Sequence, residues 1–197
     1  MDPETQLIEG VAQGNERDFE ELFRRYQARL GSFFLQRTRD RHATEELVQE
    51  TMLVVWERAS SFNSSSRPSS WIFGIGYRKY LEWYRRNSKS NQLYRSEAEQ
   101  DPEELPRESK NEVSEQIGRE TLSEQVRQAL GELSEEHRAV IDLTFQQGLS
   151  YGEIARILGT QPGTVKSRMF YAKERLKEIL IRRGMKGDEL WQISRGV

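Results

Sequence analysis

The chain has 197 residues, enough for one domain of ordinary size or for two small ones. It contains no cysteine and only two histidines, His42 and His137, which lie far apart in the sequence. This composition excludes a disulfide framework and a thiolate metal site, and it argues against a zinc site or a histidine-based catalytic relay.

The sequence carries no signal for secretion, membrane insertion or catalysis. No apolar run approaches the roughly 20 residues that a membrane-spanning helix needs. The acidic start at Met1–Glu4 lacks the hydrophobic region of a signal peptide, so we expect a cytoplasmic protein without membrane insertion. Gly74 and Gly76 fall within a helical pattern and are interpreted as packing positions. Without a phosphate-binding loop or a nucleophile–base pair, we expect neither a cofactor nor an enzyme.

Charge is sorted along the chain, although the formal net charge is only −2. From Glu97 to Glu120 there are nine acidic and three basic residues, a balance of about −6. From Gln161 to Arg183 there are seven basic and two acidic residues, a balance of about +5. Because free-standing DNA-binding domains usually carry a clear positive excess, the overall charge argues weakly against that class.

The first half of the chain has the apolar periodicity of helices. The pattern from Phe19 to Phe34 predicts a helix of about five turns, with Asn15 as its N-cap. A second helix is predicted from about Ala43 to Ser60. Such a helix usually turns its polar side to water, but an apolar residue ringed by polar ones is also typical of a protein interface. That side carries Glu46, Gln49, Glu50, Leu53 and Glu57.

A loop and an aromatic helix are predicted next. Small polar residues and Pro68 favour a loop from Phe62 to Ser70, and a helix is expected from about Ser69 to Ser88. Basic residues beside aromatic ones suit single-stranded DNA, because charge follows the backbone and rings stack on bases. The alternative is that the aromatic residues fill the core of a three-helix domain, to which we assign Trp71, Ile72 and Ile75. The two stripes of this helix are Phe73, Tyr77, Tyr80 and Tyr84, and Arg78, Arg85 and Lys89.

Residues 91–119 are predicted to be an acidic flexible linker between domains at 10–90 and 120–183, with a tail at 184–197 that has no assigned role. Prolines, glutamates and few apolar residues leave no core to bury in this linker. Four helices are expected after it, over about 120–130, 135–146, 151–158 and 162–182. Their end signals are Ser134, Ser150 with Glu153 as a capping box, and Gly148 and Gly159 as C-terminal caps.

The segment from Gly148 to Arg168 has the pattern of a helix-turn-helix: a short helix, a tight turn at Gly159, and a helix entered through Pro162. The first half of the second helix would enter the major groove, where basic side chains reach guanine edges or phosphates. A purely solvated basic face is the alternative, and the preceding helix and turn argue against it. The inner positions are Ile154, Ala155, Leu158, Val165, Met169, Ala172, Leu176 and Ile179. The outward positions are Thr164, Lys166, Ser167, Arg168, Phe170, Tyr171, Lys173 and Arg175.

Together these segments resemble the extracytoplasmic-function (ECF) group of the sigma-70 family of bacterial RNA polymerase sigma factors. The stretch from Leu133 to Leu176 resembles the domain that reads the −35 element of a promoter. Leu47–Thr51 with Trp56 resembles the polymerase-binding helix, and Trp71–Gly76 with Tyr84–Arg86 resembles the helix that reads and opens the −10 element. The order and spacing of the segments match that group.

The resemblance implies an all-α fold of two small domains, one of three or four helices for the −10 element and one of four helices containing the helix-turn-helix. It implies core RNA polymerase (its largest and second-largest subunits), promoter DNA and an anti-sigma factor as partners. The implied polymerase contacts are Glu46, Gln49, Glu50 and Leu53. The implied −10 contacts are Asn63, Arg67, Arg78, Lys79, Arg85 and Arg86, and the implied −35 contacts are Thr164, Lys166, Ser167, Arg168, Phe170, Tyr171 and Lys173.

Departures from the family pattern at Arg78–Tyr80, Glu82 and Tyr171 leave the promoter sequence open. The acidic linker is either a plain tether or a nucleic-acid mimic that occupies a basic channel of the polymerase. Two other functions compete with a sigma factor. A dimeric regulator would bind operators without polymerase, and a sigma mimic would only sequester an anti-sigma factor. Neither explains both the polymerase-binding helix and the outward basic residues.

Overall fold

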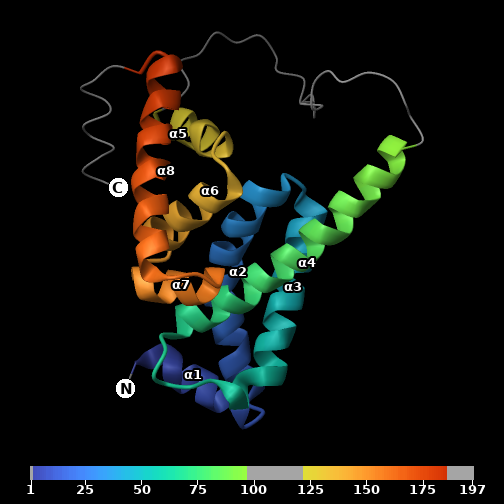
Figure 1. Cartoon of the computed structure of the whole chain (residues 1–197). Coiled ribbons are helices and arrows are strands. Elements are labelled where there is room, and N and C mark those ends of the chain that lie inside the picture. Colours follow the sequence, from blue (N-terminus) through green and yellow to red (C-terminus); the bar gives the residue numbers. More distant parts are fainter. Residues whose placement is uncertain (1, 97–121, 186–197) are drawn as a thin grey trace.

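The computed structural model describes residues 2–96 and 122–185, and every regular element in these two ranges is helical (Figure 1). The predicted all-α fold of two helical domains is confirmed. Most of the predicted linker and of the predicted tail lie outside the described residues. The part of the linker from 91 to 96 belongs to a helix, because the predicted third helix continues past Ser88 to Ser96.

The first domain begins with a helix that the periodicity did not predict, α1 (Pro3–Ala12). Asp2 caps it by accepting a hydrogen bond from the backbone N–H of Glu4, and Pro3 occupies the first turn, where a missing N–H costs nothing. The helix buries Ile8 and Val11 against the domain. Tyr26 of the next helix donates to Glu4 over 2.6 Å.

Three longer helices follow: α2 (Glu16–Thr38), α3 (Arg41–Arg58), extended by a 3₁₀ turn at Ala59–Ser61, and α4 (Pro68–Ser96). Asn15 caps α2 as predicted, accepting from the N–H groups of Arg17 and Asp18. Gly76 lets α4 approach α2 closely, since a Cβ there would lie 3.1 Å from the Phe34 ring. The fully buried core of this domain contains Leu22, Tyr26, Leu30, Phe33, Phe34, Met52, Val55, Ile72 and Phe73.

The second domain comprises α5 (Leu122–Gly131), α6 (Glu135–Ile141), α7 (Tyr151–Leu158) and α8 (Pro162–Arg182). The predicted capping box at Ser150 and Glu153 is present, and Gly159 ends α7 in the left-handed conformation at φ 63°. Ser134 caps α6 as predicted. The predicted helix over 135–146 is not regular, because it changes to a π-helical turn at Asp142–Gln146.

The two domains pack directly on each other. Figure 1 shows α4 running obliquely across the molecule, and α7 lies against its N-terminal half. One continuous cluster of buried apolar residues extends through both domains. Ile157, on the side of α7 that meets α4, is buried, whereas the predicted core residue Leu158 is only partly buried.

Candidate functional site

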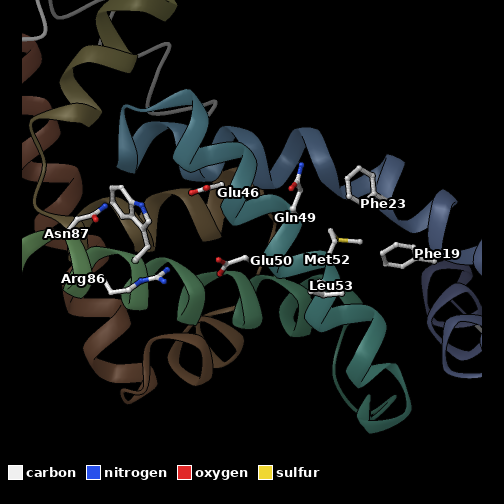
Figure 2. A pocket seen from close by; sticks show the side chains of 10 residues that line it. Phe19, Phe23, Glu46, Gln49, Glu50, Met52, Leu53, Arg86 and Asn87 are labelled. Atoms are coloured by element: carbon white, nitrogen blue, oxygen red, sulfur yellow. The ribbon is translucent and has the colours of Figure 1, made fainter.

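A groove of about 790 Å³ runs along α3 (Figure 2). The four residues predicted to bind a protein partner, Glu46, Gln49, Glu50 and Leu53, all line it. Gln49, Glu50 and Leu53 follow Glu46 at three, four and seven residues, so the four side chains share one face of the helix. Leu53 is 56% exposed although the neighbouring Met52 is buried. From the other helices the groove is lined by Phe19, Phe23, Trp83, Arg86 and Asn87.

This groove combines an apolar floor with a polar rim. The rings of Phe19 and Trp56 meet edge-on with centres 5.1 Å apart, which fixes the wall that α2 contributes. An exposed leucine beside such a floor, surrounded by carboxylates and an amide, can anchor an apolar side chain of a partner while the rim pairs with its polar groups. The groove is therefore suited to a protein rather than to a small molecule.

The basic residues predicted for −10 DNA do not form one patch. Arg78 and Arg85 are exposed on α4, whereas Arg86 lines the α3 groove. Lys79 is turned toward α3, with its ammonium 3.4 Å from a Glu50 carboxylate oxygen and 3.9 Å from one of Glu82. The Lys79 side chain therefore offsets the negative charge of Glu50 on the rim of the groove and does not extend the exposed basic surface at Arg78.

The aromatic stripe of α4 is divided between core and surface. Phe73 is fully buried and meets the Phe33 ring edge-on at 5.4 Å. Tyr77 and Tyr80 are 9% and 3% exposed, and burial raises the pKa of both hydroxyls, with Glu135 of α6 adding to the effect. Tyr84 is 54% exposed. The core alternative holds for the first three residues, and Tyr84 is the aromatic side chain of this stripe that is open to a nucleic acid.

The loop before α4 is ordered by its own polar groups. The Asn63 side chain accepts from the Ser65 N–H over 2.9 Å, and its carbonyl accepts from the Ser66 N–H, so the loop begins with a tight turn. Arg67 points to the second domain: its guanidinium donates to the Gly148 carbonyl over 2.9 Å and lies 3.7 Å from Glu153. Asn63 and Arg67 are both exposed, and the Arg67 guanidinium is in addition engaged with the second domain.

The outward face of α8 is formed largely as predicted. Thr164, Lys166 and Ser167 are exposed in its first two turns, and Phe170 and Tyr171 are 62% and 61% exposed. Gln161 makes no side-chain cap, Pro162 has no N–H, and the Thr164 and Val165 N–H groups donate to the Gln161 carbonyl, so the Gly163 N–H is the group at this helix end that a phosphate can meet. The remaining two predicted residues are partly occupied: Arg168 pairs with Glu136 over 3.2 Å, and Lys173 lies over the Phe145 ring.

A buried charge cluster joins the two domains, and the sequence reasoning did not find it. The Arg37 side chain is fully buried, donates to Asp142 and to Glu135 over 2.8 Å each, and stacks 3.6 Å from the Phe33 ring centre. Burial raises the pKa of the Asp142 and Glu135 carboxyls, against the lowering effect of Arg37. One signal was available: Arg37 continues the apolar stripe of α2, seven residues after Leu30 and four after Phe33.

Two classes of site are not seen in the described part of the chain. Within residues 2–96 and 122–185, no cluster of histidine, aspartate and glutamate side chains could hold a metal ion. Over the same ranges, no helix is both long enough and apolar enough to cross a bilayer.

Comparison with known proteins matches both domains to families. Residues 22–90 match sigma-70 region 2, and residues 123–176 match sigma-70, region 4. The ECF RNA polymerase sigma factor SigL of Mycobacterium tuberculosis is 30% identical over 171 residues, which cover 86% of this chain and 93% of SigL. The chain belongs to the ECF group of the sigma-70 family.

Other sigma factors support the same assignment. RNA polymerase sigma factor YlaC of Bacillus subtilis is 29% identical over 159 residues, covering 81% of this chain and 90% of YlaC. Among solved structures, RpoE of Bartonella quintana bound to the anti-sigma factor NepR has a TM-score of 0.64 and 26% identity, over 83% of this chain and 97% of that one. CnrH bound to the cytosolic domain of CnrY has a TM-score of 0.65 and 25% identity, over 92% and 99%.

The sigma factor is therefore a non-enzymatic initiation factor that directs promoter-specific transcription, a role that implies binding to core RNA polymerase and DNA. The region 2 match spans most of α2, all of α3 and most of α4, and the region 4 match spans nearly all of α5, then α6 and α7, and most of α8. The α3 groove and the basic face of α4 thus belong to region 2, and the exposed face of α8 belongs to region 4. The helix α1 precedes the region 2 match.

Proposed function

We propose that this sigma factor docks on the largest subunit of core RNA polymerase through the α3 groove, with Leu53 as the apolar anchor and Glu46, Gln49 and Glu50 as the polar rim. Contacts with the second-largest subunit complete the assembly. The observation that carries the proposal is the position of Leu53, an exposed leucine above a floor of Met52 and Phe19. An exposed apolar residue in such surroundings is expected where a partner covers it.

The promoter contacts are proposed on the two surfaces that carry exposed cationic and aromatic groups. In region 2, Asn63, Arg78, Tyr84 and Arg85 would hold the separated −10 strand, because arginines follow the backbone and a ring stacks on a base. In region 4, Thr164, Lys166 and Ser167 would enter the −35 major groove with the open N-terminus of α8 against a phosphate.

An anti-sigma factor is a further proposed partner. Two sigma factors of similar structure, RpoE and CnrH, were solved in complex with the anti-sigma factor NepR and with CnrY. A protein that covers the α3 groove would compete with polymerase for Leu53. A competition assay with purified core polymerase would identify such a factor by its release of the sigma factor from the polymerase.

Run-off transcription tests the proposed function. The purified chain is added to core polymerase on fragments of genomic DNA, and we expect transcripts that start downstream of a shared two-part motif. A gel shift without polymerase tests the operator-binding alternative. Tight and specific binding of the chain alone, with no effect of polymerase, would reject the proposal in favour of that alternative.

A further inference from the structure

The later turns of α4 carry two separate basic faces. Lys79 and Arg86 are seven residues apart, and so are Arg78 and Arg85. Residues seven positions apart in a helix lie on nearly the same side, and residues one position apart differ by about 100°. The helix therefore presents one face with Lys79 and Arg86 and another with Arg78 and Arg85.

The face with Lys79 and Arg86 is turned toward α3. The Lys79 ammonium lies 3.4 Å from a Glu50 carboxylate oxygen, and Arg86 lines the α3 groove together with Trp83. Figure 2 shows the Arg86 side chain directed from α4 toward Glu50 of α3. Arg86 therefore belongs to the same surface as Leu53, although it is part of the helix that was predicted to bind −10 DNA.

The face with Arg78 and Arg85 is turned away from the groove. Both arginines are exposed, and neither of them lines the groove. Tyr84, which precedes Arg85, is 54% exposed. This is the face on which a DNA strand can find cationic groups beside an open aromatic ring.

The charge of Arg86 is not used within the described part of the protein. Arg86 is exposed and forms no ion pair with any residue of 2–96 or 122–185, whereas Lys79 already offsets Glu50. A DNA phosphate is disfavoured beside Arg86, because Glu46 and Glu50 line the same groove. A carboxylate on a protein partner is favoured, since a guanidinium can donate two parallel hydrogen bonds to it.

We propose that Arg86 is a polymerase-docking residue and not a DNA contact. Its guanidinium pairs with a carboxylate of the largest subunit, while Leu53 anchors an apolar side chain of the same partner. This proposal rests on the proposed function of the α3 groove and extends the docking surface to α4. One face of α4 then binds polymerase and the other binds the −10 strand, so docking also holds in place the helix that binds DNA.

The two adjacent arginines allow a matched experiment. Arg86→Glu and Arg85→Glu change the net charge equally at neighbouring exposed positions of α4. Binding to core polymerase is measured without DNA, by fluorescence anisotropy of the labelled chain. Arg86→Glu should weaken binding about tenfold or more, and Arg85→Glu should change it less than about twofold. Because salt screens an exposed charge pair, the loss in Arg86→Glu should shrink as the salt concentration rises.

DNA binding provides the opposite readout. Holoenzymes formed at saturating concentrations of each variant are compared on a DNA fork that exposes the −10 strand. Arg85→Glu should lower affinity for the fork about tenfold, and Arg86→Glu should change it less than about twofold. A photocrosslinking amino acid at position 86 should react with the largest subunit in the absence of DNA, whereas one at position 85 should react with the fork.

The outcomes separate this proposal from the proposed function. If Leu53→Ala weakens polymerase binding but Arg86→Glu does not, Arg86 is not a docking residue and the α3 groove still is. If both variants bind polymerase normally, both proposals fail. Equal losses of polymerase binding in Arg85→Glu and Arg86→Glu would indicate a general charge effect and overturn the assignment. If Arg86→Glu does not fold, the crosslink at position 86 decides: a reaction with the fork and not with polymerase would make Arg86 a DNA contact.

Discussion

Leu53 and Leu35 are exposed leucines on neighbouring helices of region 2, at 56% and 46% exposure, but only Leu53 lines the α3 groove. Truncating an anchor at the centre of an interface typically costs about 1–2 kcal/mol or more. Leu53→Ala should therefore weaken binding to core polymerase about tenfold or more, measured by fluorescence anisotropy of the labelled chain.

Leu35→Ala is the matched control for this prediction, because it removes the same side chain from an exposed helical position. It should change polymerase affinity less than about twofold. Equal losses in the two variants would mean that the groove is not the docking surface. A normal helical circular dichroism spectrum of both proteins excludes unfolding as the cause.

Lys166 and Lys177 offer a similar comparison on α8. Both are exposed, but Lys166 lies in the first two turns, where a recognition helix meets DNA, and Lys177 lies in the C-terminal half. If Lys166 reads a base, Lys166→Ala should lower holoenzyme affinity for promoter DNA by about 1–3 kcal/mol. If Lys166 contacts a phosphate, the variant should reduce the slope of log affinity against log salt concentration by about one. Lys177→Ala should do neither when promoter binding is measured over a range of salt concentrations.

At the scale of elements, the sequence predicted best where the signal is local. The capping box of α7, the glycine that ends it and the N-caps of α2 and α6 each depend on residues a few positions apart, and all were confirmed. The prediction of one regular helix over 135–146 was wrong, because Asp142–Gln146 form a π-helical turn. That turn carries Asp142, whose partner Arg37 is 105 positions away, so no local pattern could indicate it.

The candidate surfaces were predicted unevenly for the same reason. Periodicity placed the α3 residues on one face and the α8 residues outward, because helix geometry alone decides both. It could not show that Lys79 turns to Glu50 or that Arg67 binds region 4, since those contacts depend on how helices pack. The short helix α1 was missed because its two buried apolar residues, Ile8 and Val11, are too few to establish a period.

The capping box allows a test of how much α7 depends on its first turn. The Ser150 side chain accepts from the Glu153 N–H, and Glu153 accepts in return from the Ser150 N–H. Ser150→Ala should lower the free energy of unfolding by about 1 kcal/mol, measured by urea titration. Ser32→Ala, an exposed substitution inside α2, should change it by less than about 0.5 kcal/mol.

At the scale of the whole molecule, the two regions share one apolar cluster and a buried charge cluster, so they should unfold together. Removing one partner of a buried ion pair leaves an uncompensated charge, at a cost of about 3–5 kcal/mol. For Arg37→Ala we expect the contact between region 2 and region 4 to be lost, so that Asp142 and Glu135 become hydrated. Differential scanning calorimetry should show one transition for the natural chain and two for the variant.

A buried-pair replacement serves as the control for that experiment. Arg37→Met/Asp142→Leu/Glu135→Gln removes all three charges and keeps side chains of similar size at the contact, so a single transition should return. Persistence of one transition in Arg37→Ala would contradict the prediction, because the apolar contacts alone would then hold the regions together.

Substitutions at Gly74 and Gly76 of α4 would affect different parts of the protein. At position 76 a single methyl group would press on the Phe34 ring and on Leu30 at 3.1 and 3.3 Å, inside the core of region 2. At position 74, two residues earlier and about 200° around the same helix, a methyl group would make ordinary contacts with Arg78 and, across the boundary with region 4, with Ile157. Inherited substitutions two codons apart would therefore act on different properties: one on whether region 2 folds, the other on how firmly its neighbour is held.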